Sequence, residues 1–187
     1  MRMRKPAIGV MGSAQETLAE AERARLTVVA ESLGRAIVEQ GCLLVTGETT
    51  GLPELVVQAV QKHGGFTVGI SPAQTSAEHQ ERYGLPGQGS DLVIYTGFGF
   101  KGRNVINIRS SDIVVIFGGS IGTLNEFTIA YDEGKIIGIL EGTGGVADHI
   151  RELMRALPKQ TQAALFFERD PAHLLSLCLA ELARQRG

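Results

Sequence analysis

Short apolar runs alternate with segments of helical periodicity along this chain. The runs at 7–12, 42–47 and 66–71 are rich in Val, Ile and Leu and include or adjoin glycine. The segments at 26–37 and 52–63 instead carry apolar residues at helical spacing, which is typical of an amphipathic helix. The first part of the chain therefore predicts a βαβαβ unit, which gives right-handed crossovers and a parallel sheet.

The same alternation continues in the second half. Apolar runs at 92–97, 113–117 and 135–140 precede further helical patterns, and 165–170 suits a last edge strand. We expect an α/β protein with a three-layer, doubly wound Rossmann-like fold. Its central sheet should be mainly parallel, with about six to seven strands. At 187 residues and 43% hydrophobic content, the chain is predicted to form a single domain, 1–187.

Two segments have a more local interpretation. The stretch 72–91 is polar and rich in turn formers, which favours a surface loop or short helix bordering a site. His79 within it is expected to be solvated. Asp170 and Pro171 predict the start of a C-terminal helix as N-cap and first helical residue.

Composition excludes several function classes. The formal charge of −2 and the pI near 6.1 provide no basic field, so nucleic-acid binding is not favoured. Cys42 and Cys178 are expected to be buried free thiols. The four histidines are scattered, so no metal site is predicted. Without a signal-like stretch or a run of about 20 apolar residues, we expect a cytoplasmic protein that does not cross a membrane.

The most informative segment is DIVVIFGGSIGTLNE at 112–126. It predicts a buried strand, a glycine turn and the start of a helix, because Gly118 and Gly119 carry no Cβ and permit a tight turn. The free N–H groups and the dipole of such a helix start favour a phosphate or carboxylate. A structural alternative fits equally well, since Thr123 and Glu126 also match a capping box.

Other glycine-bearing loops should lie beside this turn, because ligands of doubly wound sheets bind at the carboxyl ends of the strands. These loops follow the strands ending near 12, 47 and 97. Ser13 has an alternative role as an N-cap paired with Glu16. Arg103 can hold a phosphate through two parallel N–H bonds, or be a solvated loop charge. Lys101 is interpreted as the latter.

The candidate ligand or phosphate-binding residues share a place in, or beside, these loops. They are Gly12, Ser13, Gly47, Thr49, Thr50, Gly51, Arg103, Gly118, Gly119, Ser120, Gly122 and Thr123. Known nucleotide motifs do not explain them, because the chain lacks the Walker lysine pattern and the G-x-G-x-x-G spacing with its acidic partner. No serine stands in a G-x-S-x-G nucleophile elbow.

The helix GRNVINIRSSD followed by IVVIFGGSIGTLNE resembles the signature of the LOG-like, so-called lysine decarboxylase-like, Rossmann superfamily. The branch that it resembles most is that of the molybdenum cofactor carrier proteins, related in turn to the DNA-processing protein DprA. GVMGS, VTGETTGLPELVVQAV, VGISP and EGTGG extend the resemblance over most of the chain.

In the cytokinin-activating LOG enzymes, a helix arginine and the glutamate that ends PGGxGTxxE serve removal of the base from nucleoside 5′-monophosphates. The resemblance assigns these roles to Arg103 and Glu126. Gly118 and Ser120 replace the proline and a glycine of that motif, and Asn104 replaces a lysine. These departures favour an anion site over hydrolysis.

Two functions follow from this resemblance. The first is a binding, or carrier, protein for a phosphate-bearing small molecule such as molybdenum cofactor or a purine nucleotide. The alternative is a nucleoside 5′-monophosphate phosphoribohydrolase, in which Arg103 would orient the substrate and Glu126 would stabilise developing positive charge or position water. The family also implies a homodimer or a higher homo-oligomer.

Overall fold

The computed structural model describes residues 4–14, 19–87 and 89–187, which form alternating strands and helices. The strands are β1 Ala7–Gly12, β2 Leu43–Thr46, β3 Thr67–Ser71, β4 Leu92–Tyr95, β5 Ile113–Phe117, β6 Ile136–Leu140 and β7 Ala164–Glu168. The helices are α1 Glu20–Glu39, α2 Leu52–Lys62, α3 Ser76–Glu81, α4 Gly99–Ser110, α5 Ile121–Asp132, α6 Gly145–Ala156 and α7 Pro171–Arg186.

The strands form one sheet in the order β4-β3-β2-β1-β5-β6-β7, and every neighbouring pair is parallel. The order reverses between β1 and β5, whose last residues, Gly12 and Phe117, lie opposite each other. The predicted α/β, doubly wound fold is therefore confirmed, with seven strands in the described residues. Such a reversal leaves a crevice at the carboxyl ends of the strands.

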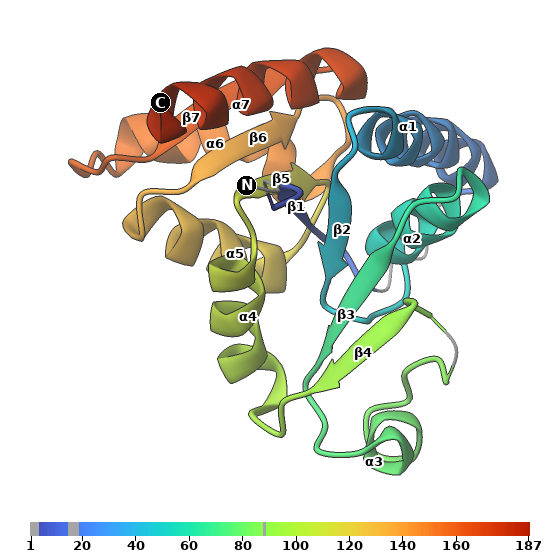
Figure 1. Ribbon diagram of the computed structural model, residues 1–187. Coiled ribbons are helices and arrows are strands. Elements are labelled where there is room, and N and C mark those ends of the chain that lie inside the picture. The colour runs from blue at the N-terminus through green and yellow to red at the C-terminus, as the bar shows by residue number, and fades with distance from the viewer. Residues whose placement is uncertain (1–3, 15–18, 88) are drawn as a thin grey trace.

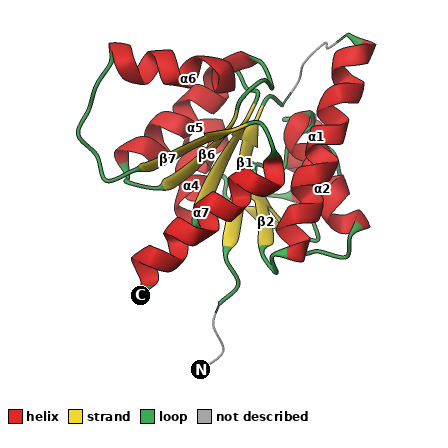
Figure 2. Cartoon of the chain, turned by 90° about the horizontal axis from the view of Figure 1, so that it is seen from above, coloured by secondary structure: helices red, strands yellow, loops and turns green. Residues whose placement is uncertain are grey.

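Helices cover the central strands on both faces (Figure 2). One apolar cluster joins α1, α2 and α7 to the sheet and includes Ile8, Leu33 and Val56, while another joins α4, α5 and α6 and includes Ile116 and Phe127. All five residues of β5 are buried, which explains why its sequence is apolar without alternation. The strand that carries the glycine turn is thus fixed from both sides.

The two cysteines lie within this core as predicted. Cys42 and Cys178 are buried free thiols. Burial raises the pKa of Cys42 to about 11 and that of Cys178 to about 12. Both side chains therefore act as small apolar groups at neutral pH.

The segment between β3 and β4 extends beyond the two helix layers and contains α3 (Figure 1). A short helix was one of the two structures predicted here. His79 is buried rather than solvated: Ser71 Oγ lies 2.9 Å from its Nδ1 and the Pro86 carbonyl oxygen 3.1 Å from its Nε2. The polar sequence around His79 did not reveal its burial. Burial is tolerated because both imidazole nitrogens have polar partners, one on β3 and one in the segment itself.

Two helices begin earlier than their sequences suggest. The sequence predicts a helix from about Arg103 to Ser111 after a glycine-rich loop, but α4 already begins at Gly99, so Phe100 and Lys101 also belong to the helix. Similarly, α5 begins at Ile121 and takes Gly122 into its first turn. Glycine weakens a helix by only about 1 kcal/mol, and packing of α4 against α5 and the sheet overrides that preference here. At the C-terminal helix, by contrast, Asp170 is the N-cap as predicted, because its side chain accepts a hydrogen bond from the His173 N–H.

Candidate functional site

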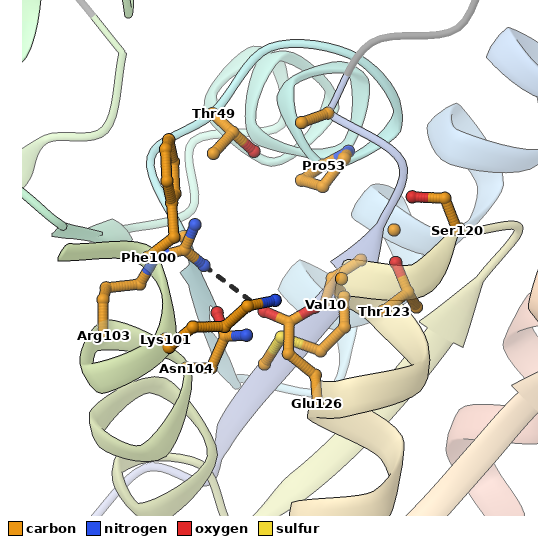
Figure 3. Close-up of a pocket in the computed structure, with 15 residues that line it drawn as sticks. Val10, Thr49, Pro53, Phe100, Lys101, Arg103, Asn104, Ser120, Thr123 and Glu126 are labelled. Carbon is orange, nitrogen blue, oxygen red and sulfur yellow. Dashed lines mark hydrogen bonds and ion pairs between the residues drawn. The ribbon is translucent and has the colours of Figure 1, made fainter. Parts of the chain in front are cut away.

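A cavity of about 270 Å³ opens at the carboxyl ends of β1 and β2, beside the turn that follows β5 (Figure 3). It lies at the reversal of strand order, where doubly wound proteins bind ligands. Helices α2, α4 and α5 contribute side chains to its wall. The lining residues are Val10, Met11, Gly12, Ala14, Gly47, Thr49, Pro53, Phe100, Lys101, Arg103, Asn104, Ser120, Gly122, Thr123 and Glu126.

The turn between β5 and α5 is held from behind by the loop that precedes α6. The Gly118 N–H donates to Thr143 Oγ1 over 2.9 Å, and the Gly118 carbonyl accepts from the Ala147 N–H at 3.0 Å. Gly145 is in direct contact, since a Cβ there would lie 2.1 Å from the Gly119 carbonyl oxygen. Gly145 therefore allows two backbones to meet, and their hydrogen bonds fix the turn.

The N-terminus of α5 faces the cavity with unpaired donors. In the described residues, no hydrogen bond uses the N–H groups of Ile121, Gly122 and Thr123, and the first turn has no acidic residue. Three free N–H groups and the positive end of the helix dipole favour an anion. The capping-box alternative is wrong, because Ser120 precedes the helix and the Glu126 carboxylate bonds to Arg103 instead.

The loops after β1 and β2 support each other from the opposite side. The Leu52 N–H donates to the Ser13 carbonyl at 3.0 Å, and the Thr50 hydroxyl donates to the Ala14 carbonyl. Gly51 adopts φ +81°, and a Cβ there would lie 2.2 Å from the Ser13 carbonyl oxygen. Ser13 does not line the cavity, nor does it cap α1, which begins at Glu20; its proposed partner Glu16 lies outside the described residues.

Arg103 and Glu126 form a buried ion pair at the cavity wall. Arg103 Nη1 lies 3.3 Å from Glu126 Oε1, and the two side chains are only 7% and 8% exposed. Gly47 makes this position possible, because a Cβ there would lie 2.0 Å from Arg103 Nη1. Arg103 is therefore not a solvated loop charge. Of its five N–H donors, the described residues engage one in a hydrogen bond.

Burial shifts both members of this pair toward their neutral forms. It raises the pKa of Glu126 to about 7, against a smaller lowering by the charges of Arg103 and Lys101. Burial also lowers the pKa of Arg103, and Glu126 partly offsets this. Because an arginine starts from a pKa above 12 and stays charged, the group that titrates near neutral pH is Glu126.

Two further side chains of α4 complete the polar wall. The Asn104 amide lies 3.3 Å from Glu126 Oε1, and the orientation that donates to this carboxylate also donates to the Phe100 carbonyl at 2.9 Å. Lys101 is exposed and reaches into the cavity near Glu126 (Figure 3). The wall thus carries two cations beside one carboxylate of raised pKa, which favours a ligand with net negative charge.

The candidate residues divide into two groups. Those that line the cavity are Gly12, Gly47, Thr49, Arg103, Ser120, Gly122, Thr123 and Glu126. Those that lie behind it are Ser13, Thr50, Gly51, Gly118 and Gly119. Sequence reasoning missed Phe100 and Pro53 as lining residues and discounted Lys101. Reading 99–110 as a helix would have placed Phe100 and Arg103 on one face, three residues apart.

Comparison with known proteins identifies the family. The family model described as SLOG cluster4 matches residues 5–175. The chain belongs to the SLOG cluster4 family. This confirms the predicted membership of the LOG-like Rossmann superfamily.

Solved structures agree with this placement. The molybdenum cofactor binding protein of Rippkaea orientalis is 30% identical, with a TM-score of 0.76 over 97% of this chain and 99% of that one. The molybdenum cofactor carrier protein of Chlamydomonas reinhardtii is 27% identical, with a TM-score of 0.70 over 96% and 99%. The structural-genomics target TM1055 is 26% identical, with a TM-score of 0.80 over 94% and 99%. Together they support a ligand-binding or LOG-like function.

The described part of the chain holds neither a metal-type cluster nor a membrane-spanning helix. No group of three or more His, Cys, Asp or Glu side chains is arranged to hold a metal ion there. Nor do the described helices include one with the length and apolar character needed to cross a membrane.

Proposed function

We propose that this protein binds, and carries, a phosphate-bearing small molecule without transforming it. The observation that carries the proposal is the set of N–H groups at the start of α5 that no described residue engages, which open into a cavity that also contains Arg103 and Lys101. Backbone N–H groups and cations act together on a phosphate, because each contributes a charge-assisted hydrogen bond.

The cavity offers a phosphate two kinds of donor, main-chain N–H groups and a guanidinium. Ser120, Gly122 and Thr123 offer the helix start to the phosphate, and Arg103 adds a guanidinium with donors still available. A volume of about 270 Å³ lies just below the range of small-molecule pockets, roughly 300–1,000 Å³. It therefore suits one mononucleotide-sized molecule rather than a dinucleotide.

Molybdenum cofactor and purine nucleotides are the two ligand types that we propose. Similarity to the molybdenum cofactor proteins of Rippkaea and Chlamydomonas supports the first, and the membership of the LOG-like superfamily supports the second. Both ligands join a phosphate to a planar heterocycle. Lys101 and Arg103 would hold the phosphate of either, and the apolar lining residues would contact the rings.

Native mass spectrometry of freshly purified protein tests this proposal. We expect a bound species of a few hundred daltons that denaturation releases, and that absorbs as a pterin or a purine. Calorimetry with AMP and with inorganic phosphate then measures binding by the same protein. Protein that carries no small molecule and binds neither AMP, inorganic phosphate nor a phosphorylated pterin would contradict the proposal.

A second candidate function is hydrolysis of nucleoside 5′-monophosphates. The contact between Arg103 and Glu126 favours it, because a carboxyl group with a pKa of about 7 is suited to general acid–base work at neutral pH. Glu126 would position the attacking water and stabilise the oxocarbenium-like charge that develops as the N-glycosidic bond breaks. Arg103 would orient the phosphate or ribose.

The Glu126→Gln variant separates the two candidates. It retains the shape of the side chain and removes its charge, so we expect the kcat of an enzyme to fall about a hundredfold or more. Release of free base from AMP and related monophosphates is followed for both proteins. Turnover by the parent that is lost in Glu126→Gln would establish the hydrolase, whereas no turnover by the parent on any monophosphate favours the carrier.

We also propose that the protein is a single domain, 1–187, and a homodimer or a larger homo-oligomer. Edge strand β4 supports self-association, because Leu92, Ile94 and Tyr95 are all more than a third exposed. Size-exclusion chromatography with light scattering tests this, and a monomer at micromolar concentration would contradict it. A cytoplasmic location and the absence of nucleic-acid binding stay predictions.

A further inference from the structure

Phe100 is an exposed aromatic residue that the polar chemistry of the site does not use. It lies in the first turn of α4 and lines the cavity, yet it is 45% exposed. A large apolar ring left open to water at the wall of a cavity is informative, because most aromatic side chains bury far more of their area.

The ring is held in place by its neighbours. Tyr83 packs perpendicular to it, with ring centroids 5.2 Å apart, and the Arg103 guanidinium carbon lies 5.8 Å from its centroid. Such contacts orient an aromatic side chain without covering it completely. A ligand that met this ring would therefore find a surface whose position is already fixed.

The two ends of the cavity differ in chemistry. Figure 3 places Phe100 beside Thr49, across the cavity from Ser120 and Thr123 at the start of α5. The α5 end offers N–H groups, whereas the Phe100 end offers an aromatic ring, and the Arg103 guanidinium reaches from beside that ring to Glu126 of α5. A molecule with its phosphate at α5 would direct its remaining atoms toward Phe100.

We propose that Phe100 is the stacking surface for a planar nitrogen heterocycle, of the purine or pterin kind, carried by the ligand. This inference rests on the proposed function and adds which part of the ligand is recognised at the end opposite the phosphate. Every such heterocycle has a π-face, and stacking on an aromatic side chain needs no matched pattern of hydrogen bonds. The site therefore selects a ring system joined to a phosphate over a phosphate alone.

Calorimetry with four probes tests the proposal: AMP, a monophosphorylated pterin, ribose 5-phosphate and adenosine. Stacking of a base on an aromatic ring is worth roughly 1–3 kcal/mol, so Phe100→Leu should weaken the binding of AMP or the pterin roughly 5- to 150-fold. Ribose 5-phosphate, which has no heterocycle, should bind parent and variant equally. Of AMP and the pterin, the probe whose binding Phe100→Leu weakens more identifies the ring type.

Two variants serve as controls. Phe66→Leu makes the same change at a phenylalanine that is 51% exposed and lies just before β3, at the amino ends of the strands and away from the cavity. This variant should leave all four affinities unchanged. Phe100→Tyr keeps the aromatic face and should retain the parent's affinity for AMP. Circular dichroism and the oligomeric state are compared for each variant, because Phe100 is exposed and its replacement should alter neither.

The outcomes separate this inference from the proposed function. Equal binding of AMP, the pterin and ribose 5-phosphate by the parent, or equal weakening of all three in Phe100→Leu, would overturn the stacking role and leave the phosphate site standing. A variant that binds AMP normally but changes its oligomeric state would also overturn it. If the parent binds no phosphorylated probe, the proposed function fails, and adenosine decides the inference: binding lost in Phe100→Leu supports it, and any other result overturns it.

Discussion

The two ends of the cavity are built in different ways. At the β5–α5 turn, main-chain groups meet main-chain groups: Val146 and Ala147 donate their N–H groups to the carbonyls of Gly119 and Gly118 at 2.9 and 3.0 Å. At the opposite end, α4 contributes side chains that reach across space to partners on other elements, as Arg103 does to Glu126. The first end is a fixed backbone cradle, and the second is an arrangement of side chains.

This difference separates recognition of a phosphate by the main chain from recognition of the ligand by side chains. A backbone cradle binds any phosphate, because its donors belong to the main chain and are independent of side-chain identity. The α4 end can change its ligand by single substitutions without altering the fold, since Phe100 and Lys101 are both exposed. We therefore expect substitutions in the cradle to act mainly on stability and those on α4 mainly on binding.

The largest effect is expected at the support of the cradle. Gly145→Ala would place a Cβ 2.1 Å from the Gly119 carbonyl oxygen, at a residue with φ +55°. Both backbones would have to move, so we expect a loss of about 3 kcal/mol or more in the free energy of unfolding, together with weaker phosphate binding. Urea unfolding measures the first effect and calorimetry with AMP the second.

Gly142→Ala is the matched control in the same loop. Its φ is +77°, but a Cβ there would meet only the flexible side chain of Arg169 at 3.8 Å or beyond. Backbone strain alone should cost about 1–2 kcal/mol. Equal destabilisation by the two variants would show that the contact between Gly145 and Gly119 contributes nothing to stability. The description of the β5–α5 turn as a fixed backbone cradle would then be wrong.

The fold was predictable because its signals are local. The apolar run at 113–117 and the helical periodicity at 26–37 each report burial of their own segment, and βαβ succession then leaves few topologies. Helix boundaries near glycine were less predictable. Gly102 and Gly122 lie inside helices because tertiary packing outweighs a preference of about 1 kcal/mol.

The site was predictable only in part, for the same reason. The glycine turn at 118–122 was recognisable because main-chain geometry dictates its residues. Burial of Arg103 was not, since it depends on Gly47, 56 positions earlier in the chain, leaving room for a guanidinium. Likewise, nothing local to Glu126 distinguishes a cap from an ion pair; the position of α4 decides between them.

The next largest effect concerns the pH dependence of stability. The pKa of Glu126 is about 7 in the folded protein against an ordinary value of 4.5. Between these pH values the folded state keeps a proton that the unfolded chain has released, so the free energy of unfolding falls as the pH rises through this window. Relative to Glu126→Gln, we expect the parent to lose about 3 kcal/mol between pH 4.5 and pH 7.

Urea unfolding of both proteins at several pH values measures this difference. Glu152→Gln provides the comparison, because Glu152 is exposed on α6 and should give the parent's pH profile. Parallel profiles for the parent and Glu126→Gln would mean that Glu126 titrates at its ordinary pKa, and would remove the physical basis for acid–base chemistry at this residue.

Arg103→Ala should act on both stability and binding. Its guanidinium is buried and paired, so removal leaves Glu126 without its partner and should cost about 2 kcal/mol of stability. Affinity for AMP should fall by roughly 1.5–3 kcal/mol. Lys101→Ala, which removes an exposed cation from the same wall, should lower it by less than about 1 kcal/mol.

Calorimetry on the three proteins ranks the two cations. Unchanged affinity in Arg103→Ala would assign the guanidinium a purely structural role in holding Glu126. A larger loss of affinity for AMP in Lys101→Ala than in Arg103→Ala would assign the main phosphate contact to Lys101, on the exposed part of the wall.

The smallest effect is expected at Ser13, which lies behind the cavity. Its Oγ is buried and has no hydrogen-bond partner among the described residues, while its carbonyl accepts from the Leu52 N–H. A buried hydroxyl without a partner costs free energy, so Ser13→Ala should stabilise the protein by up to about 1 kcal/mol. The main-chain bond survives the substitution, and affinity for AMP should therefore stay the same. Unfolding in urea and calorimetry check both expectations together: a loss of affinity in a stably folded Ser13→Ala would show that the hydroxyl contacts the ligand and would extend the cavity to the loop after β1.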